Sequence, residues 1–391
     1  MSHLSASLKL YIIIALISII FSLYLQEAYL TLNSFNNKPQ SVSLEKSKVY
    51  KKITGKKYDE RSKLEIYSDL KRNNSKISVV VPPFYFINKK TATLPLSNQS
   101  NNTIINCNEN GYYSINKTDR YGFNNPNEEW DKEEIEYVLI GDSFVYGDCV
   151  NRPHDISSVL RILSNKPVLN LGQKGNGPLL EYATLKEYVQ KNVKNIIWVF
   201  YENDINNLNF ELTSKKLNNY FNDKNYSQNL QKNQKIVDKL VFNNIQEVFN
   251  EEKRASYHLV KNDKKKYKIL KFVRLNKTKS FLKSLVLDKK TLSKFKEILS
   301  QAKNFSLENG SNFYFVYIPR YKEGKIKYNN KLFRNIKKIT EEIEISLIDV
   351  QKLVLAKENN SNKLYPFGNK GHFNIEGYRK VAKSIYDFTS D

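Results

Sequence analysis

The sequence predicts an α/β domain with a parallel sheet that helices cover on both faces. From about residue 135 onward, short segments that are apolar throughout alternate with longer amphipathic segments. Continuous apolar strands are typical of a sheet buried on both faces, whereas strands with one solvated face alternate apolar and polar residues. The chain has 391 residues, of which 40% are hydrophobic, and this is enough to fill a large core.

The elements of this domain follow from the same alternation. The predicted strands are residues 137–140, 168–171, 195–200, 313–318 and 345–349. The predicted helices are residues 154–164, 178–192, 290–307, 330–342 and 374–388. Because ligands of parallel sheets bind beyond the carboxyl ends of the strands, polar residues that follow these strands are the candidates for a functional site.

Residues 1–30 predict a membrane anchor. Residues 10–25 are apolar apart from Ser18 and Ser22, and the apolar stripe continues to Leu30, which approaches the ~20 residues of a transmembrane helix. The residues that follow the run, Gln-Glu-Ala-Tyr, form a poor cleavage site, so an uncleaved signal-anchor is favoured over a cleaved signal peptide. A buried helix of a soluble protein is the third interpretation.

Charge and cysteine usage predict that the rest of the chain is extracytoplasmic, in the periplasm or at the cell surface. Lys9 precedes the apolar run and no basic residue follows the run until Lys38, which favours an N-terminus inside the cell. The only two cysteines, Cys107 and Cys149, suit an oxidising compartment in which a disulfide persists. A disulfide between them is therefore expected, and two separate buried thiols are the alternative.

Three further regions differ in composition. Residues 31–75 mix many lysines with acidic residues and predict a basic stem, which is expected to be a solvated linker rather than a surface that contacts anionic lipid. Residues 76–132 contain short β-like runs between Asn, Gly and Pro clusters and predict a small β subregion. The α/β domain would then span residues 133–391, with a Lys/Asn-rich insertion at 206–288.

The insertion contains an apolar stripe at helical spacing. Lysines surround its members, which are Ile269, Phe272, Val273 and Leu282. A solvated helix with one apolar stripe is favoured here, and a helix on the membrane surface is the alternative.

The formal net charge of +23 favours anionic partners such as phospholipid heads or acidic polysaccharide. The chain has no zinc-finger spacing and no other nucleic-acid signature, so nucleic acid is not an expected partner. No spacing of His, Cys, Asp or Glu indicates a metal site, and no cofactor is expected.

Three polar blocks follow predicted strands. Gly141, Asp142 and Ser143 end the first strand, Gly175 lies in the glycine-rich exit of the second, and Asn203 follows the third. Glycines let backbone amides approach a ligand closely, and an asparagine amide can donate a hydrogen bond to a developing oxyanion. Each block taken alone is also explained by a turn or, for Asn203, by a helix N-cap.

His372 is the candidate general base. It lies just before the predicted helix 374–388, whose buried stripe would hold the preceding loop in place. Histidine titrates near neutral pH, as a general base must. Of the other histidines, His3 precedes the apolar run, His258 lies in the insertion and His154 begins a predicted helix.

The order of these serine, glycine, asparagine and histidine blocks resembles that of the SGNH hydrolases, also called the GDSL esterase/lipase family. The matching residues are Gly141-Asp142-Ser143-Phe144, Gly175, Asn203 and His372. The segment DRYGFNNPNEEW before the first block is also similar to a membrane-anchored branch of such proteins. The resemblance spans about residues 135 to 388, without the insertion, and implies a flavodoxin-like three-layer α/β/α fold and the hydrolysis or transfer of acyl esters.

The resemblance also implies the role of each residue. Ser143 would be the nucleophile, and His372 would take its proton and later return that proton to the leaving alcohol. The tetrahedral oxyanion would lie between the Ser143 amide, the Gly175 amide and the Asn203 side chain, and one such donor is worth roughly 3–4 kcal/mol of barrier. Asp142 would brace the turn.

Two departures from the family pattern matter. Tyr201 stands where the family usually has glycine and would narrow the mouth of the site. Asn369 stands three residues before the histidine, where the family has an aspartate, and an amide cannot stabilise an imidazolium by charge. Three outcomes are open. A backbone carbonyl orients His372, or another acid such as Asp349 or Glu376 replaces the aspartate, or the domain binds without turnover.

We therefore expect a membrane-anchored serine esterase or acyltransferase that acts on acyl esters of envelope or extracellular carbohydrate. The inferred location and the positive charge favour a carbohydrate substrate. A lipid-ester hydrolase is one alternative, and a non-catalytic carbohydrate-binding or assembly protein on the same scaffold is another.

Overall fold

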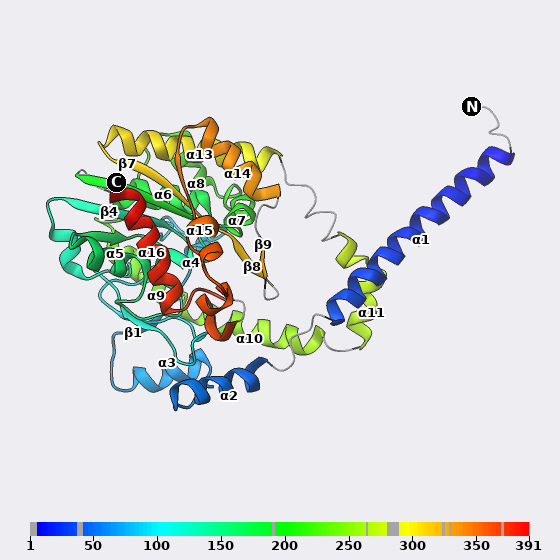
Figure 1. The fold of residues 1–391 in the computed structure, drawn as a ribbon, viewed down its shortest axis with the longest axis horizontal. Helices are drawn as coiled ribbons and strands as arrows, with labels where there is room; N and C mark the ends of the chain where they lie inside the picture. Colours follow the sequence, from blue (N-terminus) through cyan, green and yellow to red (C-terminus); the bar gives the residue numbers. More distant parts are fainter. Residues whose placement is uncertain are drawn as a thin grey trace. The chain divides into compact units, whose positions relative to one another are not determined.

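The structure of the protein is a computed structural model. It describes residues 6–36, 42–189, 192–262, 265–279, 289–322, 325–327, 331–368 and 371–390. The chain divides into two compact units, of which the first comprises residues 1–42 and 250–288 and the second comprises residues 43–249 and 289–391. The first unit contains the apolar N-terminal helix, and the second contains the α/β domain (Figure 1).

A five-stranded, all-parallel sheet forms the centre of the second unit. Its strands are β4 (Ile135–Gly141), β5 (Val168–Asn170), β6 (Val193–Tyr201), β7 (Asn312–Ile318) and β10 (Ser346–Asp349). They lie in the order β10-β7-β6-β4-β5. Read from the β5 edge and numbered along the chain, this order is 2-1-3-4-5, which is the flavodoxin-like order. The fold class predicted from the sequence is therefore confirmed.

Helices form at all five positions where the sequence predicts them, and further helices form in the N-terminal region and in the insertion. The α-helices are α1 (Ala6–Asn36), α2 (Val42–Thr54), α3 (Lys63–Lys71), α4 (Ser143–Tyr146), α5 (Ile156–Ser164), α6 (Pro178–Tyr188), α7 (Asp204–Glu211), α8 (Lys215–Asn222), α9 (Gln234–Asn243), α10 (Ile245–Asn262), α11 (Lys265–Val273), α13 (Lys289–Glu308), α14 (Lys331–Glu342), α15 (Val350–Leu353) and α16 (Ile375–Ser390). Short 3₁₀ helices include η1 (Pro83–Phe86) and η2 (Asn127–Asp131), and β8 (Arg320–Lys322) pairs with β9 (Lys325–Lys327).

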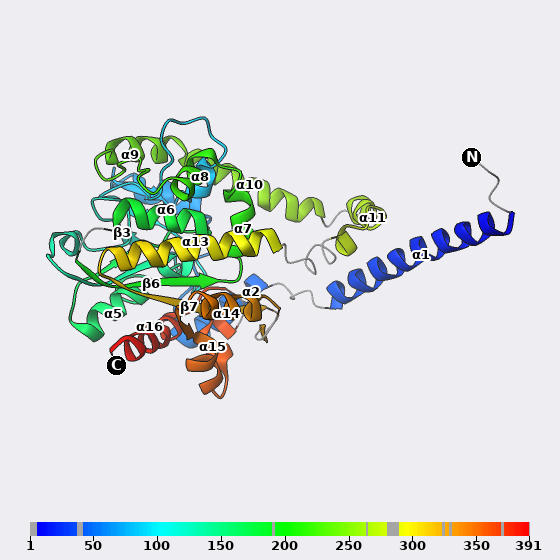
Figure 2. The same ribbon diagram turned by 90° about the horizontal axis from the view of Figure 1, so that it is seen from above.

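Helices cover both faces of the sheet because successive side chains of a strand point to opposite faces. Trp198 of β6 packs in the cluster that includes α6 and α13, whereas its neighbour Ile197 packs in the cluster that includes α5 and α16. Figure 2 shows α6 and α13 on one side of β6, and α5 and α16 on the other. Both side chains are fully buried, as expected for a strand that is apolar throughout.

The β subregion is a separate three-stranded sheet. β1 (Ile77–Val79) pairs in parallel with β2 (Thr103–Ile105), and β2 pairs in antiparallel with β3 (Ile115–Lys117). The predicted stem contains α2 and α3, and each of these helices buries one side chain, Tyr50 and Ile66 respectively.

A buried aspartate organises the segment DRYGFNNPNEEW, which connects the β subregion to the α/β sheet. One carboxylate oxygen of Asp119 accepts hydrogen bonds from the amides of Tyr121 and Phe123 at 2.8 and 2.9 Å. The other oxygen accepts from the Asn125 side chain and the Trp130 indole, both at 2.8 Å. The segment therefore folds around one side chain.

Asn125 extends this network to the edge strand β5. Its side chain donates to the carbonyl of Asn170 at 2.9 Å and accepts from the Asn170 amide at 2.8 Å. Arg161 of α5 donates to the same Asn125 oxygen at 2.7 Å. The turn segment thus fixes the strand that leads to the glycine-rich block.

Replacing Asp119 with Ala should lower the free energy of unfolding by about 3 kcal/mol or more, because four hydrogen-bond donors lose a fully buried acceptor. Denaturant unfolding followed by tryptophan fluorescence measures this, since Trp130 lies in the network. The control is Asp131→Ala, which removes an exposed ion pair with Arg120 and should cost less than about 1 kcal/mol. Equal losses for the two variants would contradict the proposed role of Asp119.

Candidate active site

Ser143 lies where β4 ends and α4 begins. Gly141 has a φ of 155°, and a Cβ there would lie 2.6 Å from both the Val199 carbonyl oxygen and a methyl of Val145. Only glycine fits this turn without displacement. The side chain of Asp142 accepts a hydrogen bond from the Phe144 amide at 2.9 Å and so caps α4. The serine is thereby held at the first position of a helix, in contact with the neighbouring strand exits.

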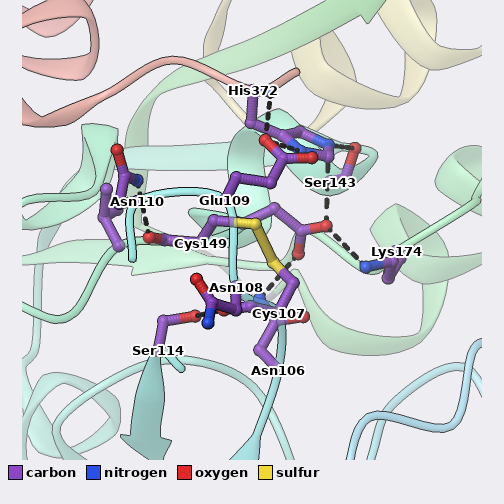
Figure 3. Close-up of a disulfide and its surroundings, with 12 residues drawn as sticks. Asn106, Cys107, Asn108, Glu109, Asn110, Ser114, Ser143, Cys149, Lys174 and His372 are labelled. Carbon is purple, nitrogen blue, oxygen red and sulfur yellow. Dashed lines mark hydrogen bonds and ion pairs between the residues drawn. A yellow bond between two sulfur atoms is a disulfide. The ribbon is translucent and has the colours of Figure 1, made fainter. Parts of the chain in front are cut away.

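His372 reaches Ser143 from the opposite end of the sequence. Asn374 accepts a hydrogen bond from the Gly377 amide at 3.0 Å and caps α16, and the buried ring of Phe373 packs on Phe144 with centroids 5.2 Å apart. These contacts fix the preceding loop. The Nε2 atom of His372 lies 2.9 Å from the Ser143 hydroxyl oxygen (Figure 3).

Glu109 is the acid at the other nitrogen of the ring. Its Oε2 atom lies 3.3 Å from Nδ1 of His372 and accepts a hydrogen bond from the His372 backbone amide at 2.7 Å. Gly371 has a φ of 148°, and a Cβ at this position would overlap the Glu109 carboxylate. A glycine before the histidine is therefore required for the close approach of the acid.

The two acids that the sequence suggested as partners of His372, Asp349 and Glu376, make other contacts. Asp349 caps α15 by accepting from the amides of Gln351 and Lys352. Glu376 accepts hydrogen bonds from Arg379 on the surface of α16. Asn369 lies outside the described residues. The acid that contacts His372 is Glu109, which was not predicted from the sequence. Its only distinguishing feature in the sequence is its position two residues after Cys107.

A disulfide between Cys107 and Cys149 joins the Glu109 loop to the segment after α4. The Cα atoms of the pair are 5.0 Å apart. Asn110 adds a second link, because its side chain donates to the Cys149 carbonyl at 2.9 Å (Figure 3). The loop that carries the acid is thus fastened to the helix that carries the serine.

A second acid, Asp148, faces the catalytic side of the imidazole. It is fully buried, and one oxygen lies 2.9 Å from the Lys174 ammonium and 3.5 Å from Nε2 of His372. The other oxygen accepts from the Asn106 side chain at 2.8 Å. The ring therefore has a carboxylate beside each nitrogen.

These charges set the protonation of the site. Burial alone would lower the pKa of His372, but the charges of Asp148 and Glu109 outweigh burial and raise it. Burial alone would raise the pKa of Glu109, but hydrogen bonds and charge from His372 lower it. Lys174 likewise overcomes burial and lowers the pKa of Asp148. Both acids are therefore ionised at neutral pH, and they favour the imidazolium.

Gly175 and Asn203 line one cavity of about 270 Å³. Its other lining residues are Phe84, Asn207, Phe210 and Glu211. Gly175 has a φ of 75°, and the Phe84 ring lies so close that a Cβ on Gly175 would be 2.7 Å from it. The side-chain amide oxygen of Asn203 (Oδ1) has no hydrogen-bond partner within the described residues.

The strand exits that carry these two residues both contact α4. The Asn170 side chain donates to the Val145 carbonyl at 2.6 Å, and the ring of Tyr201 packs on Phe144 with centroids 4.6 Å apart. Since β4 lies between β5 and β6 in the sheet, the three blocks occupy the carboxyl ends of adjacent parallel strands.

Glu109, Cys149 and His372 also form a cluster of potential metal-ligand atoms. The sulfur of Cys149 is bonded to Cys107, however, so it cannot act as a thiolate ligand. A hydroxyl, an imidazole and a carboxylate in series can instead act as a nucleophile, its general base and an orienting acid.

No family model matches the sequence, and no curated protein matches it. Similar solved structures include a protein described as lipolytic and of the G-D-S-L family from Desulfitobacterium hafniense DCB-2. It is 13% identical with a TM-score of 0.35, and the match covers 65% of this chain and 99% of that one.

Two further solved structures are similar. The acetyl xylan esterase AlAXEase is 13% identical with a TM-score of 0.37, covering 65% of this chain and 99% of that one. The Bacillus subtilis protein YxiM is 14% identical with a TM-score of 0.36, covering 70% of this chain and 58% of that one. One of the three is described as a G-D-S-L family protein, and the fold of this chain is assigned from the strand order of its own sheet.

Glu109→Gln should reduce kcat for ester hydrolysis by about 10³–10⁴-fold, because the amide cannot stabilise the imidazolium by charge. Steady-state kinetics on a short-chain aryl ester measures this. Glu376→Gln, on the surface of α16, is the matched control and should leave kcat unchanged. A Glu109→Gln variant with the kcat of the parent protein would contradict the role of Glu109.

The acid limb of the pH profile should lie above the ordinary pKa of histidine, because only neutral His372 accepts the serine proton and its pKa is raised. Activity is then lost as the pH falls through that raised value. Asp148→Asn removes a charge that favours the imidazolium, so the limb should move to lower pH. If the acid limb of the pH profile of kcat/KM lay at the same pH in Asp148→Asn as in the wild type, Asp148 would have no influence on His372.

Proposed function

We propose that the chain is a serine esterase or acyltransferase of the SGNH type. Ser143 is the nucleophile, His372 is the general base, and Glu109 orients the imidazole and stabilises its protonated form. The observation that carries the proposal is the continuous series of contacts from Glu109 through His372 to Ser143, at 3.3 and 2.9 Å. A binding protein on the same scaffold would have no need of this series.

The first chemical step transfers the acyl group to the enzyme. The Ser143 oxygen attacks the ester carbonyl carbon while Nε2 of His372 takes the hydroxyl proton. The tetrahedral intermediate collapses, the bond to the alcohol breaks, and His372 returns the proton to the leaving oxygen. Water or a sugar hydroxyl then attacks the acyl-serine in the same way, which gives hydrolysis or transfer.

The oxyanion is stabilised by three donors. These are the Ser143 amide, the Gly175 amide and the Asn203 side chain. Two observations support this assignment, since Gly175 and Asn203 line one cavity and both of their loops contact α4. One donor of this kind contributes roughly 3–4 kcal/mol to the stabilisation of the transition state.

The acyl group occupies the cavity beside these donors. Phe84 and Phe210 supply apolar surface, while Asn207 and Glu211 make the remaining lining polar. A cavity of about 270 Å³ with such a lining suits a short acyl chain better than a long one.

The enzyme acts outside the cytoplasm and is held at a membrane by α1. The segment Leu8–Leu32 is long and apolar enough to cross a bilayer, and the disulfide suits an oxidising compartment. The net charge of +23 favours substrates on acidic envelope or extracellular carbohydrate.

A fluorophosphonate probe should label the purified protein on Ser143, because the activated hydroxyl displaces fluoride from phosphorus. Intact mass spectrometry and peptide mapping locate the adduct. Ser143→Ala should abolish labelling, and Ser384→Ala, on α16, should leave it unchanged. A folded wild-type protein that takes up no probe would support the non-catalytic binding alternative instead.

Phe84→Ala should relax selectivity for short acyl chains, because the ring limits the space next to Gly175. The ratio of kcat/KM for an aryl octanoate to that for an aryl acetate should rise by about tenfold. Phe388→Ala, at a partly exposed position of α16, should leave the ratio as it is in the wild type. An equal ratio in all three proteins would place the acyl chain elsewhere.

A further inference from the structure

The apolar helix α1 carries two charged residues within its candidate span. The span runs from Leu8 to Leu32 with a mean hydropathy of 2.4, and its charged residues are Lys9 near one end and Glu27 near the other. The side chains of its apolar window are exposed, as expected of a helix whose partner is lipid. Glu27 differs from them, because only 1% of its surface is exposed.

A segment of the insertion buries Glu27. The two carboxylate oxygens accept hydrogen bonds from the backbone amides of Lys277 and Thr278, at 3.0 and 2.6 Å. The Lys277 ammonium donates to the carbonyl of Leu30 at 3.3 Å. These contacts satisfy a charge at the boundary of the apolar span, where an unpaired carboxylate would be costly.

Helix α11 packs on the same part of α1. The Tyr24 hydroxyl donates to the Val273 carbonyl at 3.0 Å, and the rings of Tyr24 and Phe272 lie with centroids 5.8 Å apart. Residues separated by about 250 positions therefore form one helical unit at the end of the candidate span (Figure 1).

Helix α11 exposes three apolar side chains among its described residues. Ile269, Leu270 and Val273 are 56%, 44% and 57% exposed, and Ile269 and Val273 share one face because they are four residues apart. In the sequence, Lys271 lies between Leu270 and Val273, and Arg274 follows Val273 just after the helix. An apolar face flanked by basic residues is the composition of a helix that lies in the headgroup region of a bilayer.

We propose that α11 lies in the interfacial layer of the membrane that α1 spans, and that Glu27 docks it there. The bilayer is the occupant of this face because α11 is fastened to the end of the span itself, so its apolar side chains are held at the height of the headgroups. The proposal rests on the membrane anchoring proposed above, but it is independent of the chemistry at Ser143.

Tryptophan scanning in vesicles tests the proposal. The full chain is inserted into phosphatidylcholine vesicles that contain lipids brominated near the headgroup or near the chain end, and emission of the native Trp130 and Trp198 is subtracted. In the Ile269→Trp variant, lipids brominated near the headgroup should quench most of the fluorescence of the introduced tryptophan. Ile17→Trp, in the span, should be quenched by the deep bromine. Ile162→Trp, on α5 of the second unit and similarly exposed, should be quenched by neither.

The outcomes separate the two proposals. Quenching of Ile17→Trp without quenching of Ile269→Trp would overturn the interfacial position of α11 and leave the anchor intact. Absence of quenching at both positions would overturn the anchor as well. Adding Glu27→Ala to Ile269→Trp should weaken the shallow quenching, whereas Ser22→Ala should not. Unchanged quenching with Glu27→Ala would refute the docking role of Glu27.

Discussion

The site depends on the contact between Glu109 and His372, and much of the surrounding structure serves to maintain it. Glu109 lies on a loop with no regular secondary structure, so its position is set by its neighbours. The Cys107–Cys149 disulfide fastens one end of the loop, and the Asn108 side chain donates to the Asp59 carbonyl at 2.7 Å. The backbone of Asp59 in turn donates to the Gly111 carbonyl at 2.9 Å. The predicted stem is thus part of the scaffold of the active site.

Three regions of the chain supply the residues of the proposed catalytic site. The parallel sheet supplies Ser143 and the two strand exits with Gly175 and Asn203, all at adjacent carboxyl ends. The C-terminal helix supplies His372 through a short loop whose packing is fixed by Phe373. The β subregion supplies the acid, which the SGNH pattern would place three residues before the histidine. Moving the acid to a separate region makes its position dependent on the disulfide and on Gly371, and in the proposed mechanism it couples the folding of that region to activity.

The sequence was sufficient for the fold and for most of the candidate site. All five strands were predicted because they are continuously apolar, and the serine and histidine were found because strand ends and helix starts leave local patterns. Glu109 could not be found in this way, because it contacts a residue 263 positions away and no local motif surrounds it. The sequence also did not predict that the insertion is divided between two units. The contacts of Glu27 with residues 277 and 278 depend on tertiary packing and leave no local pattern. The sequence left three outcomes open for the aspartate that the SGNH pattern would place at position 369. The geometry supports its replacement by another acid, and that acid is Glu109 rather than Asp349 or Glu376.

Titration of the His372 ring shows whether Glu109 acts on the imidazole. The protein is labelled with ¹⁵N-histidine in detergent, the His372 signals are assigned from a His372→Asn variant, and both ring nitrogens are followed across pH. The account predicts that wild-type His372 titrates above an ordinary histidine, and that Glu109→Gln lowers its pKa and shifts the Nδ1 signal. An identical titration and identical Nδ1 shifts in the two proteins would contradict the account, because Glu109 would then have no influence on the base that activates Ser143.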